Sequence, residues 1–219
     1  MNSKTWEKAG ELLRKSRLST LTAIARDEAC WNEAFELTML AITEERESNP
    51  DFAAEYVDLD EATDYQYNLT ECLEAYLNHM EAVEKWEVVI SSCNRVIELF
   101  SWNRSKPSQF MYRKGNALMA LGRFDEAKRF GKQWLEKYPN DLYAAASNAY
   151  LLVAMGCFEE AKTLTEQYIR DEYCCQDGAD TIFMAAYRLY EMTDDINAKQ
   201  RIEHKIAEYN RMMANKGNF

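Results

Sequence analysis

The sequence predicts an all-α protein built from helical hairpins, and three observations lead to this fold class. Apolar residues recur at helical spacing along most of the chain, in segments of helix length separated by short polar breaks. The 219 residues include only 7 Gly and 3 Pro, which leaves few of the turns that a β architecture needs. A break and its flanks also recur after 34 residues, since the run 121–128 is matched by the run 155–162. A fixed period of this kind is typical of repeated helical units.

Each of these two units has small residues where two helices must approach closely. They are Gly115 and Ala127 in the first unit, and Ala149 and Ala161 in the second. Glycine inside a helix costs about 1 kcal/mol relative to alanine. Gly115 therefore indicates a close helix–helix contact.

The breaks themselves predict how each hairpin turns. Gly122 and Gly156 stand where the first helix of each pair should end, because a residue without a Cβ readily takes the left-handed conformation. Asp125 and Glu159 follow in the first turn of the next helix, where a negative charge is favoured by the helix dipole. The segment 139–141 ends the first unit with proline and supplies Asn or Asp to cap the next helix.

These two units resemble the tetratricopeptide repeat family residue by residue. The matching positions are Gly115, Leu118, Gly122, Phe124, Ala127 and Pro139 in the first unit, and Ala149, Leu152, Gly156, Phe158 and Ala161 in the second. Gly131 departs from the family, which usually has a larger apolar residue there, and Tyr173 replaces the closing proline. The resemblance covers roughly a third of the chain. It implies an α-α superhelix, a right-handed solenoid of about five stacked antiparallel hairpins forming a single domain over 1–219.

The first part of the chain is expected to hold divergent hairpins. Residues 1–59 are predicted to form an N-terminal hairpin and connector, with helices over 5–26 and 27–47 and the connector over 52–59. Pro50 and its predecessor resist helical geometry and should end the second of these helices.

A degenerate repeat is expected over 60–103, followed by three more regular repeats. In the degenerate repeat, Asp60 should cap a long helix that reaches about Val83, and 85–100 should form its partner. The regular repeats are predicted over 108–141, 142–175 and 179–212.

Composition favours a soluble protein of the cytoplasm. Hydrophobic residues make up 47% and charged residues 29%, which is ordinary for a soluble globular chain. No apolar run approaches the length of a membrane span, and residues 1–13 lack the apolar core of a secretory signal. We therefore expect a cytoplasmic protein without a membrane partner.

Cysteine and histidine usage predicts neither disulfides nor a metal or other cofactor. The six cysteines lack a Cys-x-x-Cys pair and mostly occupy apolar helical positions, which favours buried reduced thiols. Cys174 and Cys175 lie beside a predicted loop, but adjacent cysteines are poorly placed to chelate one ion. His79 and His204 have no neighbours at ligand spacing.

Catalytic motifs are also missing from the sequence. It contains no glycine-rich phosphate loop, no serine nucleophile elbow and no histidine motif. Acidic pairs such as Glu44-Glu45 and Asp194-Asp195 are neighbours in sequence, which do not face each other on a helix. We expect no enzymatic activity and no catalytic residues.

The net charge of -11 is distributed unevenly along the chain. Residues 1–26 carry +4, residues 27–84 carry -16 and residues 85–219 carry +1, while the stretch 104–137 alone carries +6. The protein should therefore be electrically polarised, and its acidic balance disfavours nucleic acid as a partner. For any single charge, a solvated helix face is the simpler interpretation.

In the tetratricopeptide family the first helix of each pair lines a concave face, so the resemblance implies a set of groove residues. They are Glu71, Glu74, Asn78 and Glu81; then Gln109, Tyr112, Arg113, Asn116 and Met119; then Tyr143, Ala146, Tyr150 and Val153; and finally Asp180, Phe183, Tyr187 and Tyr190. Such a groove would be acidic at one end and tyrosine-rich at the other. Carboxylates attract Lys or Arg, and aromatic faces hold a cation or an apolar side chain. The alternative is that several of these tyrosines pack between neighbouring hairpins.

Chaperone-binding members of the family grip a C-terminal carboxylate with Lys, Asn and Arg from three consecutive first helices. One alignment leaves Ala75 where Asn is needed and Gln109 where Lys is needed, and the other places Glu74 at the Lys position. We therefore do not expect carboxylate capture.

Three functions stay open at this point. The first is a scaffold or adaptor that binds a basic or aromatic peptide segment of another protein. The second is a regulatory sensor that closes around a short signalling peptide or a small molecule. The third is self-association into a homo-oligomer through apolar residues at an uncapped end, such as Trp6 or Phe219.

Overall fold

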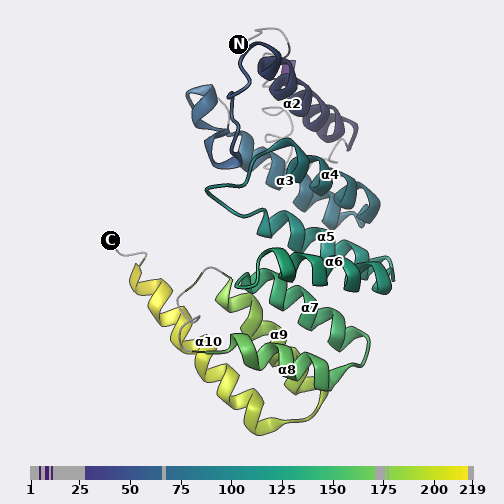
Figure 1. Cartoon of the computed structure of the whole chain (residues 1–219), viewed down its shortest axis with the longest axis vertical. Coiled ribbons are helices and arrows are strands. Elements are labelled where there is room, and N and C mark those ends of the chain that lie inside the picture. Colours follow the sequence, from purple (N-terminus) through teal and green to yellow (C-terminus); the bar gives the residue numbers. More distant parts are fainter. Residues whose placement is uncertain are drawn as a thin grey trace. The chain divides into compact units, whose positions relative to one another are not determined.

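A computed structural model describes most of the chain, and its regular elements are helical (Figure 1). The described residues are 5, 8, 9, 11, 28–65, 68–170, 176 and 178–216. Within them, the pairing of extended backbone is limited to an isolated bridge between Glu55 and Ser101. The all-α fold class is confirmed. The chain divides into two compact units, Met1–Pro107 and Ser108–Phe219.

In its described residues from Glu28 onward, the first unit contains three α-helices and two short 3-10 helices. They are α2 (Glu28–Ser48), η1 (Tyr56–Asp58), η2 (Glu61–Thr63), α3 (Leu69–Ala82) and α4 (Trp86–Leu99). Helix α3 contacts both α2 and α4. The predicted helix over 5–26 lies largely outside the described residues, while those predicted over 27–47 and 85–100 are confirmed as α2 and α4.

Arg46, near the end of α2, holds the first unit together at one place. Its guanidinium donates to the backbone carbonyls of Phe52, Ala53 and Leu99, and it lies 5.2 Å from the centre of the Phe100 ring. Desolvation by burial lowers the pKa of Arg46 from its usual value. The arginine thus joins the end of α2 to the following connector and to the end of α4.

The predicted connector over 52–59 packs closely against the segment that follows α4. The buried carboxylate of Glu55 accepts hydrogen bonds from the backbone N–H groups of Asn103 and Arg104. The Tyr56 ring packs against Phe100, with 5.4 Å between ring centres. A buried carboxylate needs such donors, because burying it without them is costly.

The prediction of a long helix that begins at Asp60 was wrong. Asp64 and Tyr65 have φ values of 51° and 55°, a left-handed conformation that cannot continue a right-handed helix. Helix α3 instead begins at Leu69, and the Asp60 carboxylate reaches it across the gap. This carboxylate accepts from the N–H groups of Leu69 at 2.6 Å and Thr70 at 3.1 Å, and from the Thr70 hydroxyl. Asp60 therefore does cap the helix, but from outside it.

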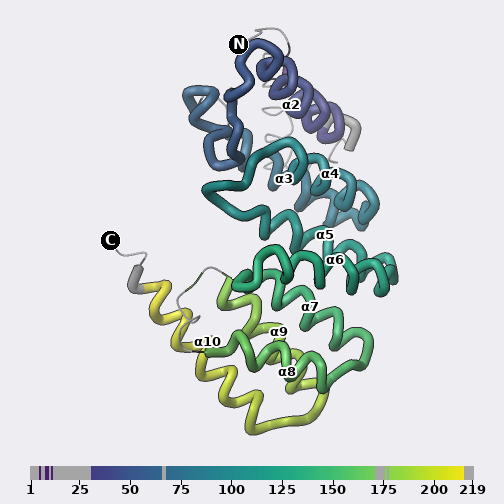
Figure 2. The backbone as a smooth tube through the Cα atoms, viewed as in Figure 1, coloured from purple at the N-terminus to yellow at the C-terminus, as the bar shows by residue number. Residues whose placement is uncertain are grey.

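In the residues that the structure describes, the second unit contains six helices in sequence. They are α5 (Ser108–Ala120), α6 (Phe124–Lys137), α7 (Leu142–Ala154), α8 (Phe158–Tyr168), α9 (Ala179–Met192) and α10 (Ile196–Lys216). The backbone tube turns back on itself from α5 to α6, from α7 to α8 and from α9 to α10 (Figure 2). Helix α7 contacts α5, α6, α8 and α9, and α9 also contacts α8 and α10. Helices α5 and α7 end at the breaks predicted at Gly122 and Gly156, and the division of the chain into repeats stays a prediction.

Helix α7 is the centre of this unit because small residues let its neighbours come close. A Cβ added at Gly115 of α5 would lie 2.5 Å from the Ser147 hydroxyl oxygen. One added at Gly131 of α6 would lie 2.3 Å from the Asn148 amide oxygen. The Asn148 side chain therefore occupies the space that a larger residue at Gly131 would need. This explains why position 131 does not carry a larger apolar residue.

A buried carboxylate at the start of α7 connects three helices of the second unit. One oxygen of Asp141 accepts from the N–H groups of Tyr143 and Ala144, at 3.0 and 3.4 Å. The other accepts from the Ser108 hydroxyl at 2.5 Å and the Trp134 indole N–H at 2.9 Å. The predicted cap is confirmed, and it also fixes the start of α5 and the end of α6 to α7.

The same left-handed turn closes four hairpins. Its central residues are Glu84, Gly122, Gly156 and Asp194, with φ values of 58°, 71°, 74° and 54°. In each turn the following residue donates its N–H to a carbonyl five residues back, as Arg123 does to Leu118 at 2.9 Å and Lys85 to Met80 at 2.8 Å. The sequence pattern predicts the turn only where glycine marks it.

Because no atom lies within 4 Å of a Cβ added at Gly156, substitution there tests backbone conformation alone. We expect Gly156→Ala to lower the free energy of unfolding by about 1 kcal/mol. Glu84→Gly should raise it by up to ~1 kcal/mol, because the strain of a left-handed glutamate is removed. Urea unfolding measures both changes. As a control, Gln133→Gly introduces glycine at an exposed helical position and should lower the free energy of unfolding. If Glu84→Gly and Gln133→Gly both raised it, left-handed strain at Glu84 would not be the cause.

Removal of the Asp141 carboxylate should be far more costly. We expect Asp141→Ala to lower the free energy of unfolding by about 3 kcal/mol, because a helix cap is lost and buried donors are left without acceptors. Asp125→Ala, at an exposed position in the first turn of α6, should change it by less than about 0.5 kcal/mol. Equal effects of the two substitutions in urea unfolding would show that Asp141 has no special structural role.

Candidate functional site

The predicted acidic residues of α3 lie in the first unit. Glu71, Glu74, Asn78 and Glu81 are spaced by three or four residues along α3, so they share one face of that helix. Glu71 and Asn78 are exposed and the other two are partly exposed. The remaining predicted site residues belong to the second unit, where their mutual geometry is defined.

The predicted residues of α5 and α7 divide into surface and core. On α5, Gln109, Tyr112, Arg113, Asn116 and Met119 are all partly exposed. On α7, Tyr143 and Tyr150 are partly exposed, whereas Ala146 and Val153 are buried in the core. Ala146 and Val153 therefore support α7 from within and offer no side chain to a partner.

On α9 the exposed stripe is shifted from the predicted one. Phe183 is fully buried and meets the Tyr209 ring of α10 edge-on, with 6.3 Å between ring centres. Tyr190 is also buried, and this burial raises its pKa. The exposed positions one turn apart are Asp180, Met184 and Arg188. The apolar residues of α9 could have indicated this register, since they alternate with these positions at helical spacing.

Two tyrosines meet where α5 and α7 pack together. The rings of Tyr112 and Tyr143 lie 6.0 Å apart between centres, with an interplanar angle of 67°. Tyr143 also lies over the residue before α9, since a Cβ added at Gly178 would be 3.0 Å from its ring. Gly178 has a φ of 82° and cannot be replaced without strain. This glycine therefore allows Tyr143 to cover the start of α9.

The pKa of Tyr150 responds to groups on both neighbouring helices. Its pKa is raised to about 12, first by desolvation on burial and then by the charges of Tyr112 on α5 and Asp180 on α9. The positive charge of Arg188 acts in the opposite direction. Tyr150 of α7 therefore lies within electrostatic reach of both neighbouring helices.

Asp180 adds a carboxylate to this surface. It is exposed and makes no hydrogen bond or ion pair with any residue that the structure describes. Met184, on the same stripe of α9, is 46% exposed. We call the surface formed by Tyr112, Tyr143, Tyr150, Asp180 and Met184 the tyrosine face. Sequence reasoning named the tyrosines and Asp180 but missed Met184.

Tyr187 lies beside this surface and already holds a cation. The Lys199 ammonium is 4.6 Å from the centre of its ring. The hydrogen bond to Tyr187 is the main cause that raises the pKa of Lys199, and Lys199 also pairs with Glu191 at 3.3 Å. The arrangement is an internal example of the cation recognition expected of an exposed tyrosine ring.

Neither a metal site nor a membrane span is found in the part of the chain that the structure describes. No three His, Cys, Asp or Glu side chains among the described residues are grouped so that they could hold a metal ion. None of the described helices is both long and apolar enough to cross a membrane. Comparison of the chain with protein-family models, curated proteins and solved structures finds no match.

The raised pKa of Tyr150 predicts a specific alkaline titration. The difference in tyrosinate absorbance between the wild type and Tyr150→Phe should show one group that ionises near pH 12. An unfolded tyrosine ionises near pH ~10. The folded state therefore holds the Tyr150 proton to a higher pH than the unfolded state does. The contribution of the protonated Tyr150 to the free energy of unfolding is complete below pH ~10 and is lost as the pH rises toward 12. A group in the difference titration that ionises near pH ~10 would contradict the burial of Tyr150.

Proposed function

We propose that this protein is a non-enzymatic adaptor that binds a basic peptide segment of another protein through the tyrosine face. The observation that carries the proposal is the grouping of the partly exposed Tyr112, Tyr143 and Tyr150, with Tyr150 in electrostatic reach of the Asp180 carboxylate, which has no ion-pair partner within the described residues. The ring faces and the carboxylate both favour a cation.

We also propose that the hairpins belong to a tetratricopeptide-like right-handed superhelix. The support comes from the turns at Gly122 and Gly156, which lie 34 residues apart and have the same backbone hydrogen bonds. Glu84 and Asp194 adopt the same turn without glycine. The arrangement of about five hairpins in one array stays a prediction.

The side chain that fits the tyrosine face best is arginine. Its planar guanidinium can stack on a ring and pair with a carboxylate at the same time, whereas lysine acts as a compact point charge. Neighbouring helices pack about 8–10 Å apart, and an extended chain advances about 3.3 Å per residue. Arginines three residues apart in an extended peptide can therefore reach equivalent positions on α5, α7 and α9.

A designed peptide tests this proposal directly. The probe is a fluorescein-labelled Gly/Ser peptide with arginine at positions i, i+3 and i+6, and fluorescence anisotropy measures its affinity. We expect Asp180→Asn to weaken binding about tenfold, since a charge-assisted contact contributes about 1.5 kcal/mol or more. Tyr150→Ala should weaken it similarly, and added salt should weaken wild-type binding.

Matched variants away from the tyrosine face serve as controls. Tyr65→Ala removes a tyrosine ring at an exposed position that follows η2. Glu203→Gln removes a carboxylate at an exposed position of α10. Asp180 is exposed, so its substitution should leave the fold intact even if Tyr150→Ala does not. Equal loss of affinity in the control variants, or full affinity in Asp180→Asn, would refute the assignment of the tyrosine face.

A further inference from the structure

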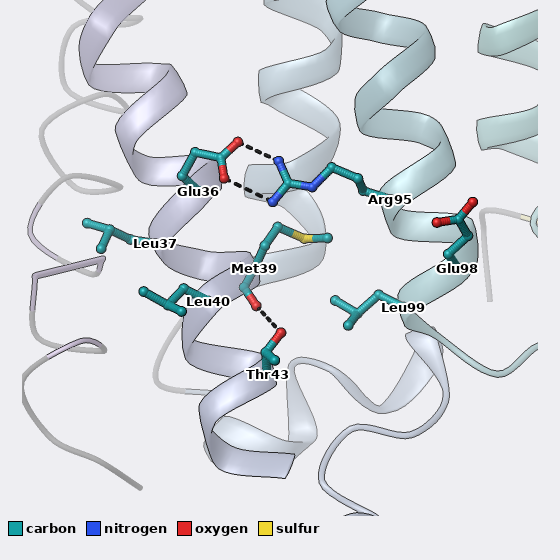
Figure 3. Close-up of a pocket in the computed structure, with 8 residues that line it drawn as sticks. All are labelled: Glu36, Leu37, Met39, Leu40, Thr43, Arg95, Glu98 and Leu99. Atoms are coloured by element: carbon teal, nitrogen blue, oxygen red, sulfur yellow. Dashed lines mark hydrogen bonds and ion pairs between the residues drawn. The ribbon is translucent and has the colours of Figure 1, made fainter. Parts of the chain in front are cut away.

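A second surface, separate in chemistry from the tyrosine face, lies in the first unit between α2 and α4. It is a hollow of about 550 Å³ (Figure 3). We call it the α2–α4 groove, and its lining residues are Glu36, Leu37, Met39, Leu40, Thr43, Arg95, Glu98 and Leu99. Its volume is within the range of about 300–1,000 Å³ that ligand pockets usually have.

Aliphatic side chains form much of this groove. Leu40 is 47% exposed, and Leu37 and Leu99 are partly exposed. Leu37 and Leu40 lie three residues apart on α2, so they form a ridge along one side of that helix. An exposed leucine next to two partly exposed ones is a surface that gains free energy when an apolar side chain covers it.

Most polar groups of the groove are already satisfied from within. Glu36 of α2 and Arg95 of α4 face each other and pair through two hydrogen bonds, one of them 2.9 Å long (Figure 3). The hydrogen bond from Glu36 is the main cause that raises the pKa of Arg95, and Phe35 backs the guanidinium at 5.1 Å from its ring centre. The Thr43 hydroxyl donates to the Met39 carbonyl at 2.9 Å. These groups therefore do not need a hydrogen-bond partner from a ligand.

Glu98 is the exception among the charged groups of the groove. It is exposed and lies three residues from Arg95 on α4, yet it makes no hydrogen bond or ion pair with any residue described by the structure. Residues 27–84, which include α2, contain seventeen acidic residues and one basic residue. The chemistry left for an occupant is thus apolar contact together with one cation.

We infer that the α2–α4 groove is a docking site for an amphipathic helix of a partner protein. Aliphatic anchors of this helix cover Leu40 and Leu99, and a Lys or Arg on its flank pairs with Glu98. A helix suits the site because its own ridge of side chains at i, i+3 and i+4 packs along the ridge of α2. The inference does not depend on the tyrosine face, whose ligand is an extended arginine peptide.

The experiment uses the full chain and a designed helical probe. The probe is an acetylated and amidated 16-residue peptide of Ala, Leu and Lys, with Leu at i, i+3, i+4 and i+7 and Lys on the flanks of this stripe. Anisotropy of a labelled copy gives the affinity. We expect Leu40→Gln and Glu98→Lys each to weaken binding about tenfold, because one loses an apolar contact and the other reverses a charge.

A charge exchange makes the test specific. A second probe with Glu in place of Lys should bind the wild type weakly and should recover about tenfold on Glu98→Lys. Met213→Gln and Glu203→Lys, exposed positions of α10, are the matched controls and should leave binding unchanged. Asp180→Asn should also leave it unchanged, so failure of this inference and failure of the proposed function are separable.

Two results would overturn the inference. The first is a Glu98→Lys variant that binds both probes as the wild type does. The second is a wild-type protein whose mass rises with concentration and falls on Leu40→Gln, because the groove would then be occupied by a second copy of the chain.

Discussion

The second unit depends on the buried carboxylate of Asp141. Its two oxygens accept four hydrogen bonds, from the start of α7 itself, from Ser108 at the start of α5 and from Trp134 in α6. Such a group is stable in the interior only while every acceptor site is matched by a donor, so it specifies one arrangement of the three helices. Helix α7 carries Tyr143 and Tyr150 and also contacts α8 and α9. This capping interaction therefore fixes α7, which carries two residues of the tyrosine face, to α5 and α6.

Most local features of this fold could be predicted from the sequence, but the start of α3 and the long-range packing could not. The helix boundaries, the turns at Gly122 and Gly156 and the cap at Asp141 each depend on residues close in sequence, which the pattern displays directly. The prediction of a helix from Asp60 failed because Asp64 and Tyr65 adopt a left-handed conformation, which the apolar pattern does not indicate. On α9, the family register placed Phe183 and Tyr190 in a groove, whereas packing against α10 and the core buries them.

Both candidate surfaces are identified by an exposed carboxylate that lies beside apolar or aromatic side chains. At two places in the first unit the charged groups are matched internally, as in the hydrogen bonds of Arg46 to backbone carbonyls and the pair between Glu36 and Arg95. Asp180 and Glu98 differ, because each is an exposed carboxylate without an ion pair in the described part of the chain, and each lies beside exposed apolar or aromatic surface. The tyrosine rings around Asp180 favour a flat guanidinium, while the leucines near Glu98 favour an aliphatic helix face. An adaptor with these two surfaces would distinguish two kinds of basic segment.

The most direct test of the central claim is a nuclear magnetic resonance titration that follows the aromatic signals of Tyr112, Tyr143 and Tyr150 while N-acetylarginine amide is added. Our account predicts that the Tyr150 signals shift and saturate, that Asp180→Asn weakens this response, and that the exposed Tyr65 shifts without saturation. Shifts of equal size and shape at Tyr150 and Tyr65, unaffected by Asp180→Asn, would show that the tyrosine face does not recognise a cation.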